Sequence, residues 1–279
     1  MPSDSTAVMV TAIFLLLVGF LCAKYLGALK SIILFYRYLR HEKALGSPQD
    51  LPGFNAGDLQ ALTRQMEELG FVFLEDELTR TYSSKAEPLP EEPAVTAPPI
   101  AAPTASAATP TNPQKRPTAF ERMMTQPEHG CLGKLSFTPL TTARGKVVAK
   151  ASMGIILTSI AEGSDWIYFT TDLVYPPSVA ALLSLQRHPH RLTTRVRHAS
   201  PQELLQMHLS RRAAIAKAAG IQWKRTLNMD DDRHIDDVTI AEARRLYQRM
   251  TVWQMLKGMV GYWREKKSDE WLGELAGRI

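Results

Sequence analysis

VVAKASMGIILTSI (147–160), AEGSD (161–165) and WIYFTT (166–171) are the three consecutive pieces of sequence that decide our interpretation of the fold. The first piece is rich in apolar side chains, and the last is aromatic and β-branched, as strands usually are. The piece between them has the chemistry of a turn. We therefore predict a β-hairpin whose loop is longer than the two-residue loops that are most common.

A globular domain is expected around this hairpin, over residues 120–223. Its length is close to the commonest domain size of about 100–150 residues. Leu132–Phe137 predicts another strand, and Val179–Leu185 predicts a short helix. The residues Ser200–Glu203 read Ser-Pro-Gln-Glu, a capping box with proline at the first helical position. They predict a helix that continues to about Ala219.

A short helix and a strand precede this domain, over residues 46–82. Asp58 can cap a helix that runs to Leu69, and Phe71–Leu74 predicts a strand. This strand alone has too little to pack against. We therefore expect it to join the 120–223 domain as one α+β unit, with two separate units as the alternative.

Residues 83–119 are rich in proline and alanine. Half of the 18 prolines of the chain lie here, with few large apolar side chains between them. Such a composition cannot bury enough apolar surface to fold, so it predicts a disordered linker. A docking site for an aromatic-lined groove is the alternative.

Residues 1–45 predict a transmembrane anchor followed by a juxtamembrane helix. The run Ala7–Cys22 reads AVMVTAIFLLLVGFLC and carries no charge. With Ala23 it is long enough to cross a bilayer, which takes roughly 17–25 apolar residues. A cleaved signal peptide would begin with basic residues and end at small ones, and neither is present. Basic residues follow from Lys24 to Lys43, so we expect a single-pass protein with its N-terminus outside and its C-terminal domain cytoplasmic.

Residues 224–279 are expected to form an acidic linker and then an amphipathic helix. Thr239–Glu242 opens a helical pattern that can continue to about Lys266. Its apolar face is rich in methionine and aromatic side chains, which suit a partner's groove or a membrane interface. Packing on the parent domain is the alternative. The candidate contacts on this face are Trp253, Met259, Tyr262 and Trp263.

The segment from residue 187 to residue 225 is strongly basic, and Glu203 is its one acidic residue. Excess positive charge attracts phosphate-bearing partners. If the domain is held near a bilayer, anionic lipid is a nearer partner than nucleic acid. A solvated basic face is the alternative. The candidate residues for binding an anionic surface are Arg187, Arg191, Arg195, Arg197, Arg211 and Arg212.

Histidines in the same segment raise the question of a metal site. His188, His190 and His198 lie close together in the sequence, but Pro189 argues for a turn rather than a strand. No cysteine or carboxylate follows at a matching interval. The carboxylates from Asp230 to Asp237 do not have the order of a calcium-binding loop. We therefore predict no metal ligand and no cofactor.

Standard catalytic motifs are also missing from the sequence, including nucleophile elbows, phosphate-binding loops and zinc-protease helices. Cys131 is expected to be a structural thiol. The predicted fold class is α+β, with a single N-terminal transmembrane helix, a small mixed α/β domain that contains a β-hairpin, and a C-terminal amphipathic helix. The predicted function is a membrane-anchored, non-catalytic interaction or scaffold module whose partners are the bilayer and a protein. The alternatives are a hydrolase-like enzyme at the membrane surface, which would use the histidine- and arginine-rich segment, and a less favoured nucleic-acid tether.

Overall fold

The computed structural model describes residues 24–83, 117–141, 147–149, 153–175, 177–264 and 269–279. The chain divides into two compact units. The sheet unit comprises residues 40–174, 187–236 and 268–279. The helical unit comprises residues 1–39, 175–186 and 237–267.

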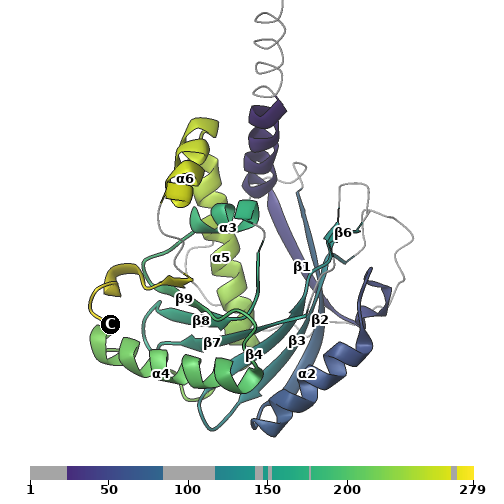
Figure 1. Ribbon diagram of the computed structural model, residues 1–279, viewed down its shortest axis with the longest axis vertical. Helices are drawn as coiled ribbons and strands as arrows, with labels where there is room; N and C mark the ends of the chain where they lie inside the picture. The colour runs from purple at the N-terminus through teal and green to yellow at the C-terminus, as the bar shows by residue number, and fades with distance from the viewer. Residues whose placement is uncertain (1–23, 84–116, 142–146, 150–152, 176, 265–268) are drawn as a thin grey trace, which may run out of the picture. The chain divides into compact units, whose positions relative to one another are not determined.

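An eight-stranded sheet is the framework of the sheet unit, with the strand order β1-β2-β3-β4-β7-β8-β9-β10 (Figure 1). Neighbouring strands from β2 to β8 pair antiparallel, β8 and β9 pair parallel, and β9 and β10 pair antiparallel. Two short strands, β5 and β6, form a separate sheet. The bounds are β1 (Leu39–Leu45), β2 (Val72–Ser83), β3 (Ala119–Gln126), β4 (Cys131–Phe137), β5 (Leu140–Thr141), β6 (Val147–Ala149), β7 (Gly154–Ile160), β8 (Ile167–Thr171), β9 (Arg191–Arg195) and β10 (Glu270–Trp271).

The predicted hairpin is confirmed as β7 and β8, which pair antiparallel from Ile156 with Thr171 to Ile160 with Ile167. The first half of its first strand is a wrong prediction, because residues 147–149 belong to β6 in the other sheet. Strand β7 begins instead at Gly154. A Cβ atom at this position would lie 2.1 Å from the side chain of Leu173, so only glycine fits without a shift.

The strand predicted at Phe71–Leu74 is longer than expected and lies inside the sheet. As β2 it pairs antiparallel with β3, from Val72 opposite Thr125 to Thr79 opposite Ala119. The segments before and after the predicted linker therefore share one sheet. Most of that linker, residues 84–116, lies outside the described residues, and Ala119 at its predicted end already belongs to β3.

Two helices cover one face of the sheet, α2 (Ala56–Glu68) and α4 (Pro201–Ala219) (Figure 1). The cap of α2 is Asn55, whose side chain accepts a hydrogen bond from Gly57, and not Asp58 as predicted. The predicted capping box of α4 is confirmed, and the helix ends before Gly220 in a left-handed conformation. Side chains of both helices enclose the main apolar core with strands β3, β4 and β7.

The opposite face is covered by the first part of α5 (Met229–Arg249), where Ile235 packs against Leu132 and Ile167. The prediction of an acidic linker here is wrong, because Asp230, Asp231 and Asp232 form the first turn of this helix. The Asn228 side chain accepts hydrogen bonds from the backbone N–H groups of Asp230 and Asp231, at 3.0 and 3.1 Å. Carboxylates are favourable at this end of a helix because of its dipole.

The helical unit contains a helix over residues 24–37, α3 (Pro177–Ser184), the second part of α5 and α6 (Val252–Arg264). The prediction of one helix to Lys266 is wrong, because α5 ends at Arg249 and α6 begins at Val252. A second capping box explains the break: Gln254 N–H donates to the Thr251 hydroxyl at 3.2 Å, and Thr251 N–H donates to the Gln254 side chain at 2.8 Å. The core of this unit is formed by Leu29, Ile33, Ala181, Tyr247, Met255 and Met259.

The predicted transmembrane helix requires a correction. Among the residues that the structure describes, no helix is both long and apolar enough to span a bilayer. The proposed span, Ala7–Ala23, lies outside those residues, and the helix that follows carries Lys24, Lys30 and Arg37. The fold class is therefore corrected to a mixed α/β fold built on an eight-stranded sheet. The predicted single-pass membrane localisation is not supported.

Candidate functional site

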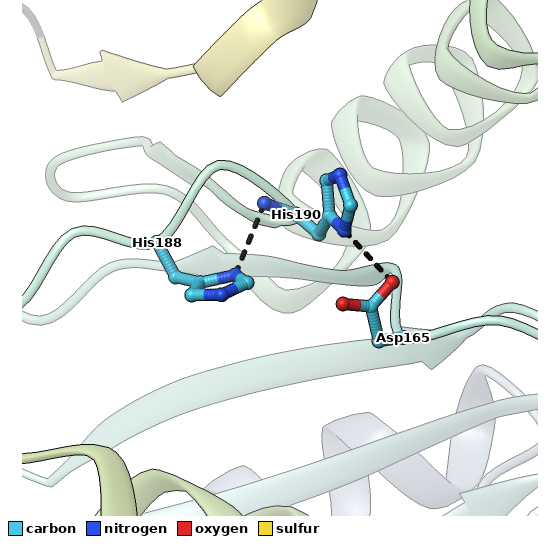
Figure 2. A group of neighbouring side chains, drawn as sticks. All are labelled: Asp165, His188 and His190. Atoms are coloured by element: carbon cyan, nitrogen blue, oxygen red, sulfur yellow. Dashed lines mark hydrogen bonds and ion pairs between the residues drawn. The ribbon is translucent and has the colours of Figure 1, made fainter.

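One group of potential ligands lies at the edge of the sheet where β8 and β9 begin. These strands pair parallel, with Ile167 opposite Arg191. The N-terminal ends of parallel strands meet at the same edge, so the turn before β8 lies beside the turn before β9. This pairing brings Asp165 next to His188 and His190 (Figure 2).

The three side chains are close enough to share one ligand. Nδ1 of His190 lies 2.8 Å from a carboxylate oxygen of Asp165, and the backbone N–H of His190 donates to Nδ1 of His188 at 3.2 Å (Figure 2). One potential ligand atom from each residue lies within 4.8 Å of the other two. The hydrogen bond with His190 lowers the pKa of Asp165, so this carboxyl group is ionised at neutral pH.

Contacts around the turn hold the two histidines in place. The His190 ring stacks on Trp166, with 4.4 Å between ring centroids, and the Trp271 indole N–H donates to the backbone carbonyl of His188 at 3.1 Å. Gly273, whose φ of +52° favours glycine, lies directly against the Pro189 carbonyl; a Cβ atom there would be 2.0 Å from that oxygen. The C-terminal segment therefore clamps the turn that carries both rings.

From the sequence we predicted no metal ligand, because the sequence does not show how the strands pair. Pro189 does lie in a turn, as expected, but the missing carboxylate comes from the preceding hairpin rather than from the same segment. His198, which the sequence grouped with these histidines, is exposed beyond β9 at a φ of +58° and is not in the group. A strand–turn–strand pattern on its own does not show which strands pair in parallel, so Asp165 was missed.

The arginines of the basic segment are largely engaged by protein groups. Arg197 pairs with Asp269 at 3.0 Å, and Arg211 pairs with Glu270 at 2.9 Å. Arg187 lies over the ring of Trp271, with its guanidinium carbon 4.6 Å from the ring centroid. These contacts reduce the positive charge that the segment presents to a partner. Binding of an anionic surface stays a prediction.

Arg212, another of the predicted anion-binding residues, is half-buried. It donates a hydrogen bond to the backbone carbonyl of His129 and lies over the Trp223 ring. Burial lowers its pKa. The two remaining candidates, Arg191 and Arg195, are half-buried in β9 and have their own interactions within the protein.

The outward face of α6 exposes three large apolar side chains. Trp253 is 73% exposed, Trp263 is 54% exposed and Val260 is 36% exposed. Of the other two predicted contacts, Met259 is buried in the core of the unit and Tyr262 is half-buried beside it. The structure therefore keeps the two tryptophans as candidate contacts and assigns Met259 to the core.

A buried ionic cluster joins β1–β4 to the first part of α5. Lys43 and Lys134 lie among four carboxylates. Burial disfavours the charged lysines, but the surrounding carboxylates outweigh it and raise the pKa of both. These carboxylates already have cationic partners, so the cluster is suited to holding α5 on the sheet. Its four acidic members are Glu77, Glu121, Asp232 and Asp236.

His208 resembles a catalytic base by its contacts but not by its surroundings. Its ring nitrogens lie 2.9 Å from the hydroxyls of Ser159 and Thr170, and all three side chains are fully buried. Burial lowers the pKa of His208 to about 3, so the ring is neutral. Burial also raises the pKa of the Cys131 thiol to about 12. Neither group is placed to meet a substrate.

Comparison with known proteins gives no match: no family model, no curated protein and no solved structure is similar to this chain.

Proposed function

We propose that this protein is a non-catalytic interaction module whose protein partner binds the outward face of α6. The observation that carries this proposal is the exposure of Trp253 and Trp263 on one side of a helix whose other side is buried. Between them, Val260 lies seven residues after Trp253 and three before Trp263, so the three side chains follow one stripe.

The size of these side chains makes the stripe suitable for binding. Burying a large apolar side chain contributes roughly 1.5–3 kcal/mol, and an aromatic residue buries about 150–250 Å². Tryptophan is among the residues that most often dominate the energy of protein interfaces. Met255 and Met259 already anchor the helix from its other side, so the tryptophans are not needed for the core of the unit.

The charges on α6 indicate what kind of partner fits. Lys257 and Arg264 are exposed beside the tryptophan stripe, and the helix contains no acidic residue. A second copy of the same face would bring these cations together, which is unfavourable. The complementary partner is therefore an amphipathic helix with an apolar stripe and acidic flanks.

Capture followed by direct titration tests this proposal. The full chain is used to capture proteins from an extract of its source cells, alongside a Trp253→Ala/Trp263→Ala variant. A matched control, Met207→Ala/Leu246→Ala, removes two other exposed apolar side chains, which are 37% and 36% exposed. A captured protein is then purified and titrated by calorimetry.

We expect the tryptophan double variant to bind at least about 100-fold more weakly than the wild type, since two interface hot spots of about 2 kcal/mol each would be lost. The matched control should bind normally. A partner that binds both double variants equally well would rule out the α6 face. A Lys257→Glu/Arg264→Glu variant should also bind an acidic partner more weakly, and most clearly at low salt.

A further inference from the structure

We propose that Asp165, His188 and His190 form a binding site for a divalent first-row transition-metal ion, at the edge of the sheet where β8 and β9 begin. This site is independent of the α6 face and does not rest on the proposed function. It uses residues of the sheet unit alone.

The donor set suits such an ion. Two imidazole nitrogens and one carboxylate oxygen are common ligands of zinc and of its first-row neighbours, whereas magnesium and calcium prefer oxygen ligands. Three protein ligands leave the fourth tetrahedral position open for water or for a side chain of a partner. The site is reachable from solvent, because the side chains of Asp165 and His190 are 66% and 31% exposed.

The geometry needs only a small adjustment. Zinc bonds of about 2.0–2.2 Å in a tetrahedron place the ligand atoms roughly 3.4 Å apart. The three potential ligand atoms here already lie within 4.8 Å of one another. Asp165 can supply most of the movement because it is exposed and lies in the turn between β7 and β8.

The hydrogen bonds of the two rings show which contacts an ion would replace. Nδ1 of His188 accepts the hydrogen bond from the His190 backbone N–H with its single lone pair, so an ion bound at this nitrogen would replace that hydrogen bond. Nδ1 of His190 faces Asp165, and an ion bound there would take the place of the hydrogen bond that joins them, with the ring as its neutral tautomer that carries the proton on Nε2. Because a histidine ligand binds a metal as its neutral ring, the three ligands would together carry one negative charge, which partly balances the ion.

The surrounding contacts supply the support that metal ligands usually need. Stacking on Trp166 fixes the plane of the His190 ring, and the Trp271 indole holds the backbone at His188. Gly273 against Pro189 prevents the turn from opening on that side. Such outer contacts reduce the entropy that is lost when ligands are ordered, so the two histidines are held in place before an ion binds, while Asp165 moves to complete the site.

Zinc titration of the full chain tests the proposal. The purified protein is labelled with ¹⁵N-histidine, treated with a chelator, and titrated with zinc while NMR follows the ring nitrogens. Competition with a chromophoric chelator gives the affinity. The variants are Asp165→Asn, which keeps a hydrogen-bond acceptor for His190, and His190→Ala. The matched control is His234→Ala, which removes an exposed histidine of α5.

We expect one zinc ion per chain, with shifts at the His188 and His190 rings and none at His198. Asp165→Asn and His190→Ala should each bind zinc at least about tenfold more weakly, while His234→Ala should bind like the wild type. Thermal melts without metal confirm that the variants are folded. Absence of binding, equal binding by Asp165→Asn, His190→Ala and the wild type, or loss of binding in His234→Ala would each overturn the proposal.

Discussion

Replacing Lys134 by methionine should strongly destabilise the sheet unit. Its ammonium group lies 3.1 Å from Glu121 and 3.2 Å from Asp232, and only 10% of its side chain is exposed. Methionine has a similar length but no charge, so the four carboxylates of the cluster would share Lys43, and Glu77 would keep a second contact with Arg233 at 3.5 Å. Breaking a buried ion pair by removing one partner typically costs about 3–5 kcal/mol, because the remaining charge is left buried without compensation.

An exposed ion pair with nearly the same separation provides the matched control. Arg197 and Asp269 lie 3.0 Å apart, but their side chains are 52% and 41% exposed. Exposed pairs contribute about 0–1 kcal/mol, so Arg197→Met should change the free energy of unfolding by no more than that. The two ion pairs therefore have nearly the same separation of charged groups and differ mainly in how deeply they are buried.

Urea unfolding followed by tryptophan fluorescence and circular dichroism measures both variants. We expect the loss of stability in Lys134→Met to exceed that in Arg197→Met by at least about 2 kcal/mol. Adding Glu121→Gln should recover part of the loss, because one uncompensated carboxylate is removed. If Lys134→Met and Arg197→Met are equally stable, the view that burial controls the energy of this cluster is refuted.

Three further predictions concern His208, Gly273 and Thr251. The pKa of His208 is about 3 in the folded protein and about 6.5 in the unfolded chain. The contribution of His208 to stability is therefore present above pH 6.5. It decreases as the pH falls towards 3, by at most about 1.4 kcal/mol per pH unit. His208→Gln should therefore flatten the unfolding free energy measured between pH 7 and pH 5, and an unchanged slope would contradict this. Gly273→Ala should lower the free energy of unfolding in urea by about 1–3 kcal/mol and weaken zinc binding, because its Cβ would meet the Pro189 carbonyl. Gly277→Ala is the control for this clash, because a Cβ atom at Gly277 has open space around it. Thr251→Ala should destabilise the helical unit by about 1 kcal/mol, because α6 loses its cap. Amide hydrogen exchange in α6 should then be faster than in the wild type, and unchanged exchange would argue against the cap.

Local signals in the sequence predicted the elements that depend on neighbouring residues. The capping box at Ser200 and the turn before Trp166 specify their helix and hairpin within a few residues. The two capping signals that we missed, Asn228 for α5 and Thr251 for α6, were equally local. Both lie inside a stretch that we interpreted by its acidic charge and its apolar period, and those broader patterns obscured the caps.

Long-range pairing was beyond the sequence argument. The parallel pairing of β8 with β9 and the return of residues 270–271 to the sheet as β10 join segments whose local patterns do not specify each other. These two pairings bring Asp165 to His190 and place Asp269 and Glu270 beside the basic segment. The candidate metal site and the ion pairs of the arginines could therefore be recognised only from the fold.

The α6 face is tested most directly by site-specific photo-crosslinking. A photoreactive phenylalanine derivative is placed at Val260, on the outward face of α6, and separately at Gln206, an exposed position of α4. We expect that one protein is crosslinked from position 260 and not from position 206, and that Trp253→Ala/Trp263→Ala abolishes the product. Equal crosslinking of that protein from both positions, or a product that survives the double substitution, would contradict it.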